Sequence, residues 1–88
     1  MEAYKITIKN NLINGNWNLT SSQHAEMSSI SDDLDYAWNN WDEEILRTYY
    51  EGEKPEQPTE EFVKVWVDNE DFEADGYDVD RLKELFEK

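Results

Sequence analysis

The first residues of the chain alternate between apolar and polar side chains. Tyr4, Ile6 and Ile8 are each followed by a lysine or a threonine. A period of two is typical of a β-strand with one buried face, and the isoleucines favour that interpretation. The Asn14-Gly15 pair that follows favours a tight turn between two strands. We therefore expect an N-terminal β-hairpin whose second strand covers residues 17–20.

The middle of the chain has the pattern of a long amphipathic helix. Apolar residues recur there at steps of three or four, namely Leu34, Ala37, Trp38, Trp41, Ile45 and Tyr49. This spacing predicts a helix over residues 32–51 with one buried stripe. Ser31 is a suitable N-cap, and Gly52 with two later prolines ends the helix. Residues 21–31 contain too few apolar side chains to define a face, so they fit either a loop or a weak helical turn.

Two more elements are expected in the last third of the chain. Residues 62–67 contain valine at every second position, which favours a third strand, although a helical turn begun by Thr59 also fits them. Asp78 can cap a C-terminal helix in which Val79, Leu82, Leu85 and Phe86 form the buried stripe. The sequence thus predicts an α+β fold in the order ββαβα, and 88 residues form a single domain.

Acidic residues dominate the charge and are unevenly distributed. The chain has 22 Asp and Glu against 8 Lys and Arg, a formal net charge of -14. Residues 1–31 are neutral overall, so the whole excess lies in residues 32–88. Two stretches contain acids and no base: the first acidic run, residues 32–44, and the second acidic run, residues 68–80. Such charge repels nucleic acid and anionic membranes, so we expect neither as a direct partner; an electrostatic partner should be basic.

The residue inventory argues against catalysis. There is no cysteine and only one histidine, His24, so disulfides, thiolate metal sites and a cysteine nucleophile are excluded. We expect no enzymatic activity, no cofactor and no structural metal. A weak calcium site is an alternative, because Asp71, Glu73, Asp75 and Gly76 match the start of an EF-hand loop, but Leu82 stands where that loop needs a glutamate. The sequence shows neither a membrane span nor a secretory signal, and we expect a cytoplasmic protein.

Aromatic side chains are expected in two roles. Tyr36 and Tyr50 fall on the acidic side of the predicted long helix, where they either anchor a partner or pack beneath the hairpin or the linker. The tryptophans lie on predicted buried faces and are expected in the core; they are Trp17, Trp38, Trp41 and Trp66.

Candidate partner-binding residues come from the two acidic runs and the two tyrosines. They are Asp32, Asp35, Tyr36, Asn39, Glu43, Glu44, Tyr50, Asp68, Glu70, Asp71, Glu73 and Asp75. In its size, its charge, its lack of cysteine and its two acidic runs, the chain resembles the small DNA-mimicking inhibitors of phages and mobile elements, including anti-CRISPR and antirestriction proteins.

This resemblance is compositional and covers at most residues 32–88. It implies stoichiometric blocking of the basic groove of a nucleic-acid-binding enzyme, such as a CRISPR effector or a restriction enzyme, without turnover or cofactor. An adaptor or an antitoxin-like interaction module is the alternative, and a weak calcium-binding domain is a third possibility.

Overall fold

The protein is all-helical in the computed structural model, which describes residues 2–15 and 17–87. No strand occurs among these residues, so the expected α+β fold with the order ββαβα is wrong. The elements are α1 (Ala3–Asn14), α2 (Ser21–Asn40), α3 (Glu43–Leu46), the 3-10 helix η1 (Arg47–Tyr49), α4 (Glu60–Asn69) and α5 (Val79–Phe86).

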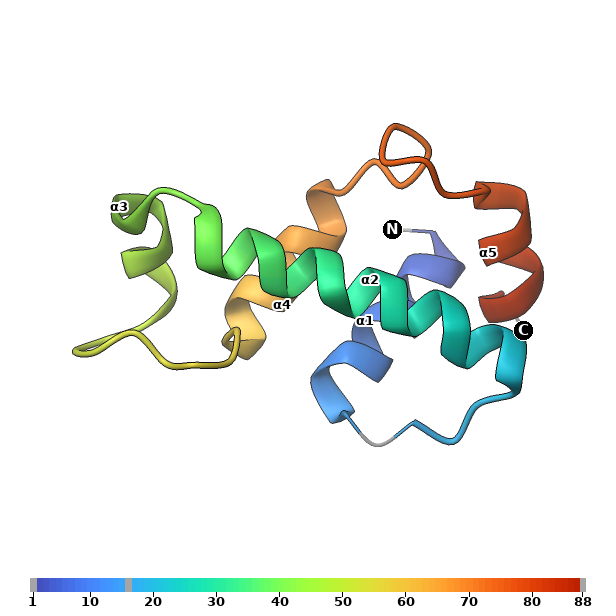
Figure 1. The fold of residues 1–88 in the computed structure, drawn as a ribbon, viewed down its shortest axis with the longest axis horizontal. Helices are drawn as coiled ribbons and strands as arrows, with labels where there is room; N and C mark the ends of the chain where they lie inside the picture. Colours follow the sequence, from blue (N-terminus) through green and yellow to red (C-terminus); the bar gives the residue numbers. More distant parts are fainter. Residues whose placement is uncertain (1, 16, 88) are drawn as a thin grey trace.

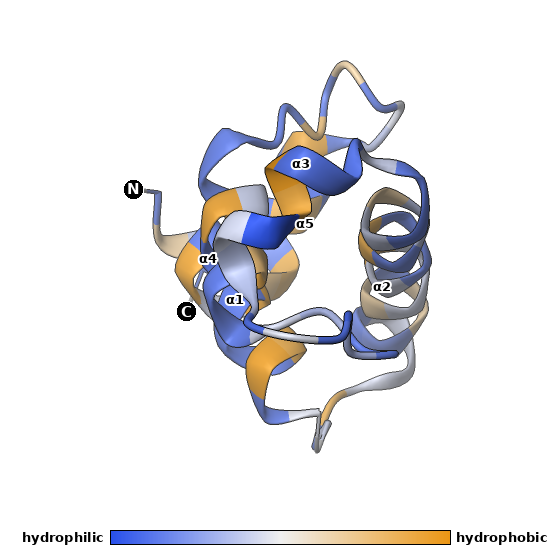
Figure 2. Cartoon of the chain, turned by 90° about the vertical axis from the view of Figure 1, so that its left-hand side faces the viewer, coloured by the Kyte–Doolittle hydropathy of each residue, from blue (hydrophilic) through white to orange (hydrophobic). Residues whose placement is uncertain are grey.

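The helices form two sides of one small bundle. Figure 2 shows α2 on one side and α1, α4 and α5 on the other. In Figure 1, α2 crosses the molecule along its longest direction, and the molecule measures 39 × 27 × 20 Å. Helix α1 packs most closely with α4 and α5, and α2 also contacts α1 and α5. The core therefore lies between α2 on one side and α1, α4 and α5 on the other.

The expected N-terminal hairpin is replaced by α1. Tyr4 and Ile8 are buried, whereas Ile6 is 43% exposed. Residues four apart share a face of a helix, and residues two apart do not, so Ile6 distinguishes the two periods. Gly15 ends the helix with a φ of 66° and donates its N–H to the carbonyl of Asn11 at 3.0 Å. The Asn-Gly pair is therefore a helix C-cap, a position that also favours glycine.

The predicted long helix begins earlier than residue 32. The Thr20 side chain accepts the N–H of Gln23, and the Gln23 side chain reaches back to the N–H of Thr20, forming a capping box. Met27 and Ile30 extend the buried stripe in front of Leu34. The expected N-cap at Ser31 is wrong, because Ser31 lies inside α2.

The same helix also ends earlier than residue 51. Trp41 is extended, with a ψ of 157°, and the Asp42 side chain accepts the N–H of Glu44 to start α3. This break turns two predicted core residues outward: Trp41 is 41% exposed and Ile45 is 50% exposed. Trp38 and Trp66 are buried as expected, and Trp17 is half-buried.

The predicted third strand, residues 62–67, is part of α4. Thr59 caps this helix by accepting the N–H of Phe62, which agrees with the helical alternative. Its buried residues Phe62, Val63, Trp66 and Val67 follow the helical period, and Val65 is exposed. The C-terminal helix is confirmed as α5, with Asp78 accepting the N–H of Arg81.

Two phenylalanine rings organise the aromatic core. Phe62 meets the rings of Trp38, Trp41 and Tyr49 edge-on, at centroid distances of 5.0, 5.3 and 5.4 Å. Phe72 meets Tyr4, Trp66 and Tyr77 edge-on, at 6.3, 6.2 and 5.7 Å. Edge-to-face geometry is favourable for aromatic rings because it brings a positive edge to a negative face.

The period of the first helix can be tested with two isoleucine variants. Ile8→Ala should lower the free energy of unfolding by about 2–5 kcal/mol, because Ile8 is fully buried. The matched change Ile6→Ala should cost less than about 1 kcal/mol, since that side chain is already 43% exposed to solvent. Urea denaturation measures both. Equal losses would contradict α1 and support a strand.

Candidate functional site

The first acidic run is divided between α2 and α3. Asp32 and Asn39 are exposed on α2, and Asp35 is half-buried between them. Glu43 and Glu44 are exposed in the first turn of α3. The predicted helix over residues 32–51 would have carried all of these residues, but the chain changes direction at Trp41, so Glu43 and Glu44 lie on a separate helix.

The two candidate tyrosines have different positions. Tyr36 is 71% exposed on α2, as a partner anchor requires. Tyr50 is half-buried and packs edge-on against Trp38, with ring centroids 5.9 Å apart. Tyr50 thus belongs to the core boundary, and Tyr36 is the outward aromatic residue of the pair.

The second acidic run surrounds a loop that a buried ring holds in place. We call residues 70–78 the acidic loop. Phe72 is only 1% exposed, and its carbonyl accepts the N–H of Tyr77 at 2.9 Å. Asp71, Glu73 and Asp75 are exposed on the loop, Asp68 is exposed on α4, and Glu70 is half-buried. The exposed carboxylates of the loop therefore face solvent, while the buried Phe72 ring holds the loop backbone in place.

The carboxylates of the possible calcium loop, residues 71–82, do not point towards a common metal position. The Asp71 carboxylate accepts the N–H of Ala74 at 3.2 Å within its own turn. Within residues 2–15 and 17–87, no group of three or more histidine or carboxylate side chains is arranged to hold a metal ion.

A hollow of about 280 Å³ brings the two acidic runs together. We call it the acidic recess. It is lined by Asp33 and Tyr36 of α2, Trp41, Trp66 of α4, and Glu70 and Asp75 of the acidic loop. Tyr36, Glu70 and Asp75 were sequence candidates, whereas Asp33 and the two tryptophans were not assigned to a site.

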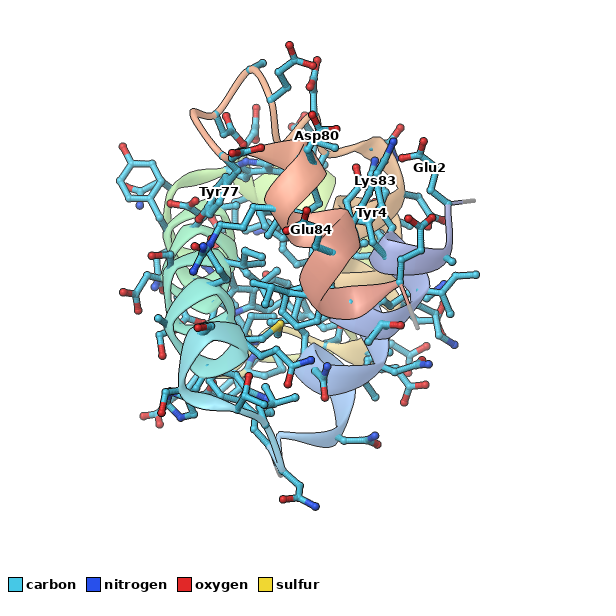
Figure 3. All side chains as sticks on the ribbon, turned by 90° about the vertical axis from the view of Figure 1, so that its right-hand side faces the viewer. Glu2, Tyr4, Tyr77, Asp80, Lys83 and Glu84 are labelled. Atoms are coloured by element: carbon cyan, nitrogen blue, oxygen red, sulfur yellow. The ribbon has the colours of Figure 1, made fainter. Side chains whose placement is uncertain are left out.

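Tyr77 connects the acidic loop to α2 beside this recess. Its hydroxyl donates to the Asp33 carboxylate at 2.6 Å, across 44 positions of sequence. Figure 3 shows Tyr77 lying next to α2, while Asp80 and Glu84 project from α5. Because this hydrogen bond joins the two runs, it fixes how their carboxylates lie relative to each other.

Three side chains near these surfaces have raised pKa values. Burial raises the pKa of Tyr77, and its hydrogen bond to Asp33 adds to the shift. Burial, followed by repulsion from Glu2, raises the pKa of Tyr4 to about 12. Burial also raises the pKa of the Asp35 carboxyl, and the nearby Asp32 acts in the same direction.

Ion pairs between described residues use carboxylates outside the two acidic runs. Lys64 pairs with Glu60 at 3.3 Å and lies 3.9 Å from Glu61. Arg81 pairs with Glu26 at 3.3 Å, and Lys83 with Glu2 at 3.8 Å. The cations of these pairs therefore leave the charge of the two runs available to a partner.

Comparison of the chain with protein-family models, with curated proteins and with solved structures finds no match. Among the helices of the described residues, none has the length and apolar character needed to cross a membrane.

The raised pKa of Asp35 predicts that Asp35→Asn stabilises the protein near neutral pH. A carboxyl that ionises less readily when folded opposes folding once it is charged, so its contribution to stability is lost as the pH rises through its folded pKa. Thermal unfolding at about pH 7 should show a higher Tm for the variant. The difference should vanish well below the ordinary pKa of 3.8. A lower Tm at neutral pH would contradict this environment for Asp35.

The tyrosines predict a loss of stability in alkali. Their pKa is 10.0 when unfolded and higher when folded, so the stability that they contribute is complete below pH 10 and falls as the pH rises towards about 12. Urea denaturation at about pH 8 and about pH 11 should show a smaller drop for Tyr4→Phe/Tyr77→Phe than for the wild type. An identical drop would show that neither phenol is buried as described.

Proposed function

We propose that the protein is a stoichiometric inhibitor that presents carboxylates in place of nucleic acid phosphates and occupies the basic groove of a nucleic-acid-binding enzyme. The observation that carries this proposal is the acidic recess, where Asp33 of the first acidic run meets Glu70 and Asp75 of the second. Two runs separated in sequence thereby form one negative surface.

The amount of charge supports a binding role. A net charge of magnitude about 2–8 is enough to keep a small domain in solution. The chain carries -14, and the excess destabilises the folded state through self-repulsion. Duplex DNA carries about one negative charge per 1.7 Å, so a basic groove that binds DNA also attracts a rigid surface of carboxylates.

The compositional resemblance supports the class of target. A CRISPR effector or a restriction enzyme has a groove of the required positive charge, and an inhibitor that fills such a groove needs neither turnover nor a cofactor. The proposal implies a cytoplasmic protein, because enzymes of this class act on nucleic acid in the cytoplasm.

A second candidate function is that of a protein-interaction adaptor. It is favoured by three exposed apolar side chains, Tyr36, Trp41 and Ile45, each more than two fifths exposed. Aromatic side chains often anchor protein interfaces. An adaptor anchored in this way should bind with little dependence on salt and should leave nucleic acid binding by its partner intact.

Partner capture from a lysate of the native host separates the two functions. A captured nucleic-acid-binding enzyme that is released both by duplex DNA and by added salt supports the inhibitor, since charge contacts weaken steeply with salt. A partner that DNA does not displace, and that survives high salt, contradicts the inhibitor and supports the adaptor.

The acidic runs, rather than net charge alone, should carry this binding. With the captured partner, Asp71→Asn/Glu73→Gln/Asp75→Asn and Asp35→Asn/Glu43→Gln/Glu44→Gln should each weaken binding by about tenfold or more in titration calorimetry. Glu51→Gln/Glu53→Gln/Glu56→Gln removes the same charge from the exposed linker between η1 and α4 and should have a much smaller effect. Equal losses in all three would show that only total charge matters.

A further inference from the structure

We propose that the acidic recess binds a single arginine side chain of the partner protein. The inference deepens the proposed function, on which it rests for the origin of that arginine in a basic groove. The guanidinium group would lie against the aromatic walls of the recess and form charge-assisted hydrogen bonds with its carboxylates.

The charge of the recess distinguishes it from other hollows on the surface. Three of its six lining residues are acids, and none is a base. A larger hollow beside α5 has four acids in its lining but also Lys5 and Lys83, whose ammonium groups repel a cation. Another hollow there has three acids together with Lys83. The hollow beside the linker is mainly apolar and has Asp35 as its one acid. Of these four hollows, the acidic recess is the one that combines several acids with no base.

Aromatic rings give the recess a second feature that points to a cation. Tyr36, which is 71% exposed, and Trp41, which is 41% exposed, line the recess, and the buried Trp66 forms another part of its wall. Cations are attracted to the faces of tyrosine and tryptophan rings. Trp66 packs edge-on against Phe72, and Trp41 against Phe62, so both indoles are already held in place before a ligand enters.

The C-terminal ends of the two neighbouring helices already have cationic partners. The Glu70 carbonyl, at the C-cap of α4, accepts the Lys5 ammonium at 2.6 Å, and the Trp38 carbonyl, in the last turn of α2, accepts the Lys54 ammonium at 2.6 Å. These lysines offset the partial negative charge of the helix ends. The case for a cationic ligand therefore rests on the carboxylates and the aromatic rings of the recess.

Arginine suits this combination better than lysine or a whole small molecule. A guanidinium is planar, stacks on aromatic rings and can bond two carboxylate oxygens, whereas an ammonium is a compact and strongly hydrated charge. The volume of about 280 Å³ is just below the ~300–1,000 Å³ typical of pockets that enclose a complete drug-sized ligand. A hollow of this size has room for a single side chain.

Three capped tripeptides test the inference on the intact protein: acetyl-Gly-Arg-Gly-amide, its lysine analogue and its uncharged citrulline analogue. Each is titrated at constant ionic strength while the indole N–H signals of Trp41 and Trp66 are followed by NMR. The arginine peptide should shift both signals and bind about threefold or more tightly than the lysine peptide. The citrulline peptide should cause no saturable shift. Equal responses to arginine and lysine, or no response to arginine, would overturn the inference.

Variants of exposed side chains locate the binding. Tyr36→Leu should weaken the arginine peptide about threefold because it removes the ring, and Tyr36→Phe should retain binding. Asp33→Asn/Asp75→Asn should weaken it about fivefold, whereas Glu51→Gln/Glu53→Gln, with the same charge change on the linker, should not. If the recess pair and the linker pair have the same effect, the peptide is attracted by overall charge and the inference is wrong.

The peptide experiment and the partner experiment can fail independently. If DNA displaces the captured enzyme but the peptides show no preference for arginine, the proposed inhibitor function is supported and the proposed arginine site is contradicted. If the peptides bind at a specific arginine site but DNA does not displace the captured partner, the arginine site is supported and the inhibitor function is contradicted.

Discussion

Burial of Phe72 is the contact on which the acidic surface depends. The ring lies in the middle of the second acidic run, where neighbouring carboxylates repel one another and favour an open chain. Edge-on packing against Tyr4, Trp66 and Tyr77 connects that loop to α1, to α4 and to itself. Because an aromatic side chain buries about 150–250 Å², one such anchor can offset much of the repulsion. The loop can then present its charge from a fixed position.

The sequence predicted a helix correctly where the N-cap residue and the spacing of the apolar residues indicated the same element. The C-terminal helix is an example, since Asp78 and the apolar residues after it permit no strand. The first helix was missed because Tyr4 and Ile8 fit both periods, and the exposed Ile6 completes a false alternation. The true start of α2 was visible in the spacing of Thr20 and Gln23, but the polar residues after it obscured the stripe. Its end at Trp41 has no glycine or proline to mark it.

The sequence indicated the acidic character of the candidate site, but it did not indicate which distant residues come together to form it. Composition alone identified the two acidic runs, and of the two alternatives left open for Tyr36 the structure shows the exposed one. Asp33 and Tyr36 lie three residues apart, so even the predicted helix over residues 32–51 placed them on neighbouring positions of one face, but Asp33 was not assigned to the site. The bond from Tyr77 to Asp33 joins distant parts of the chain, and no local pattern indicates it. Trp41 reached the recess only because the helix breaks there.

The packing of α1 has a consequence for the order in which the chain can complete its fold during synthesis. This helix is made before the two helices with which it packs most closely, α4 and α5. The Lys5 ammonium also donates to the carbonyl of Glu70, 65 positions further on. Contacts with α2 can form earlier, but the covering of Tyr4 and Ile8 is completed only after α4 and α5 have been made. Mutual repulsion between chains that already carry the first acidic run keeps these unfinished copies apart during that interval.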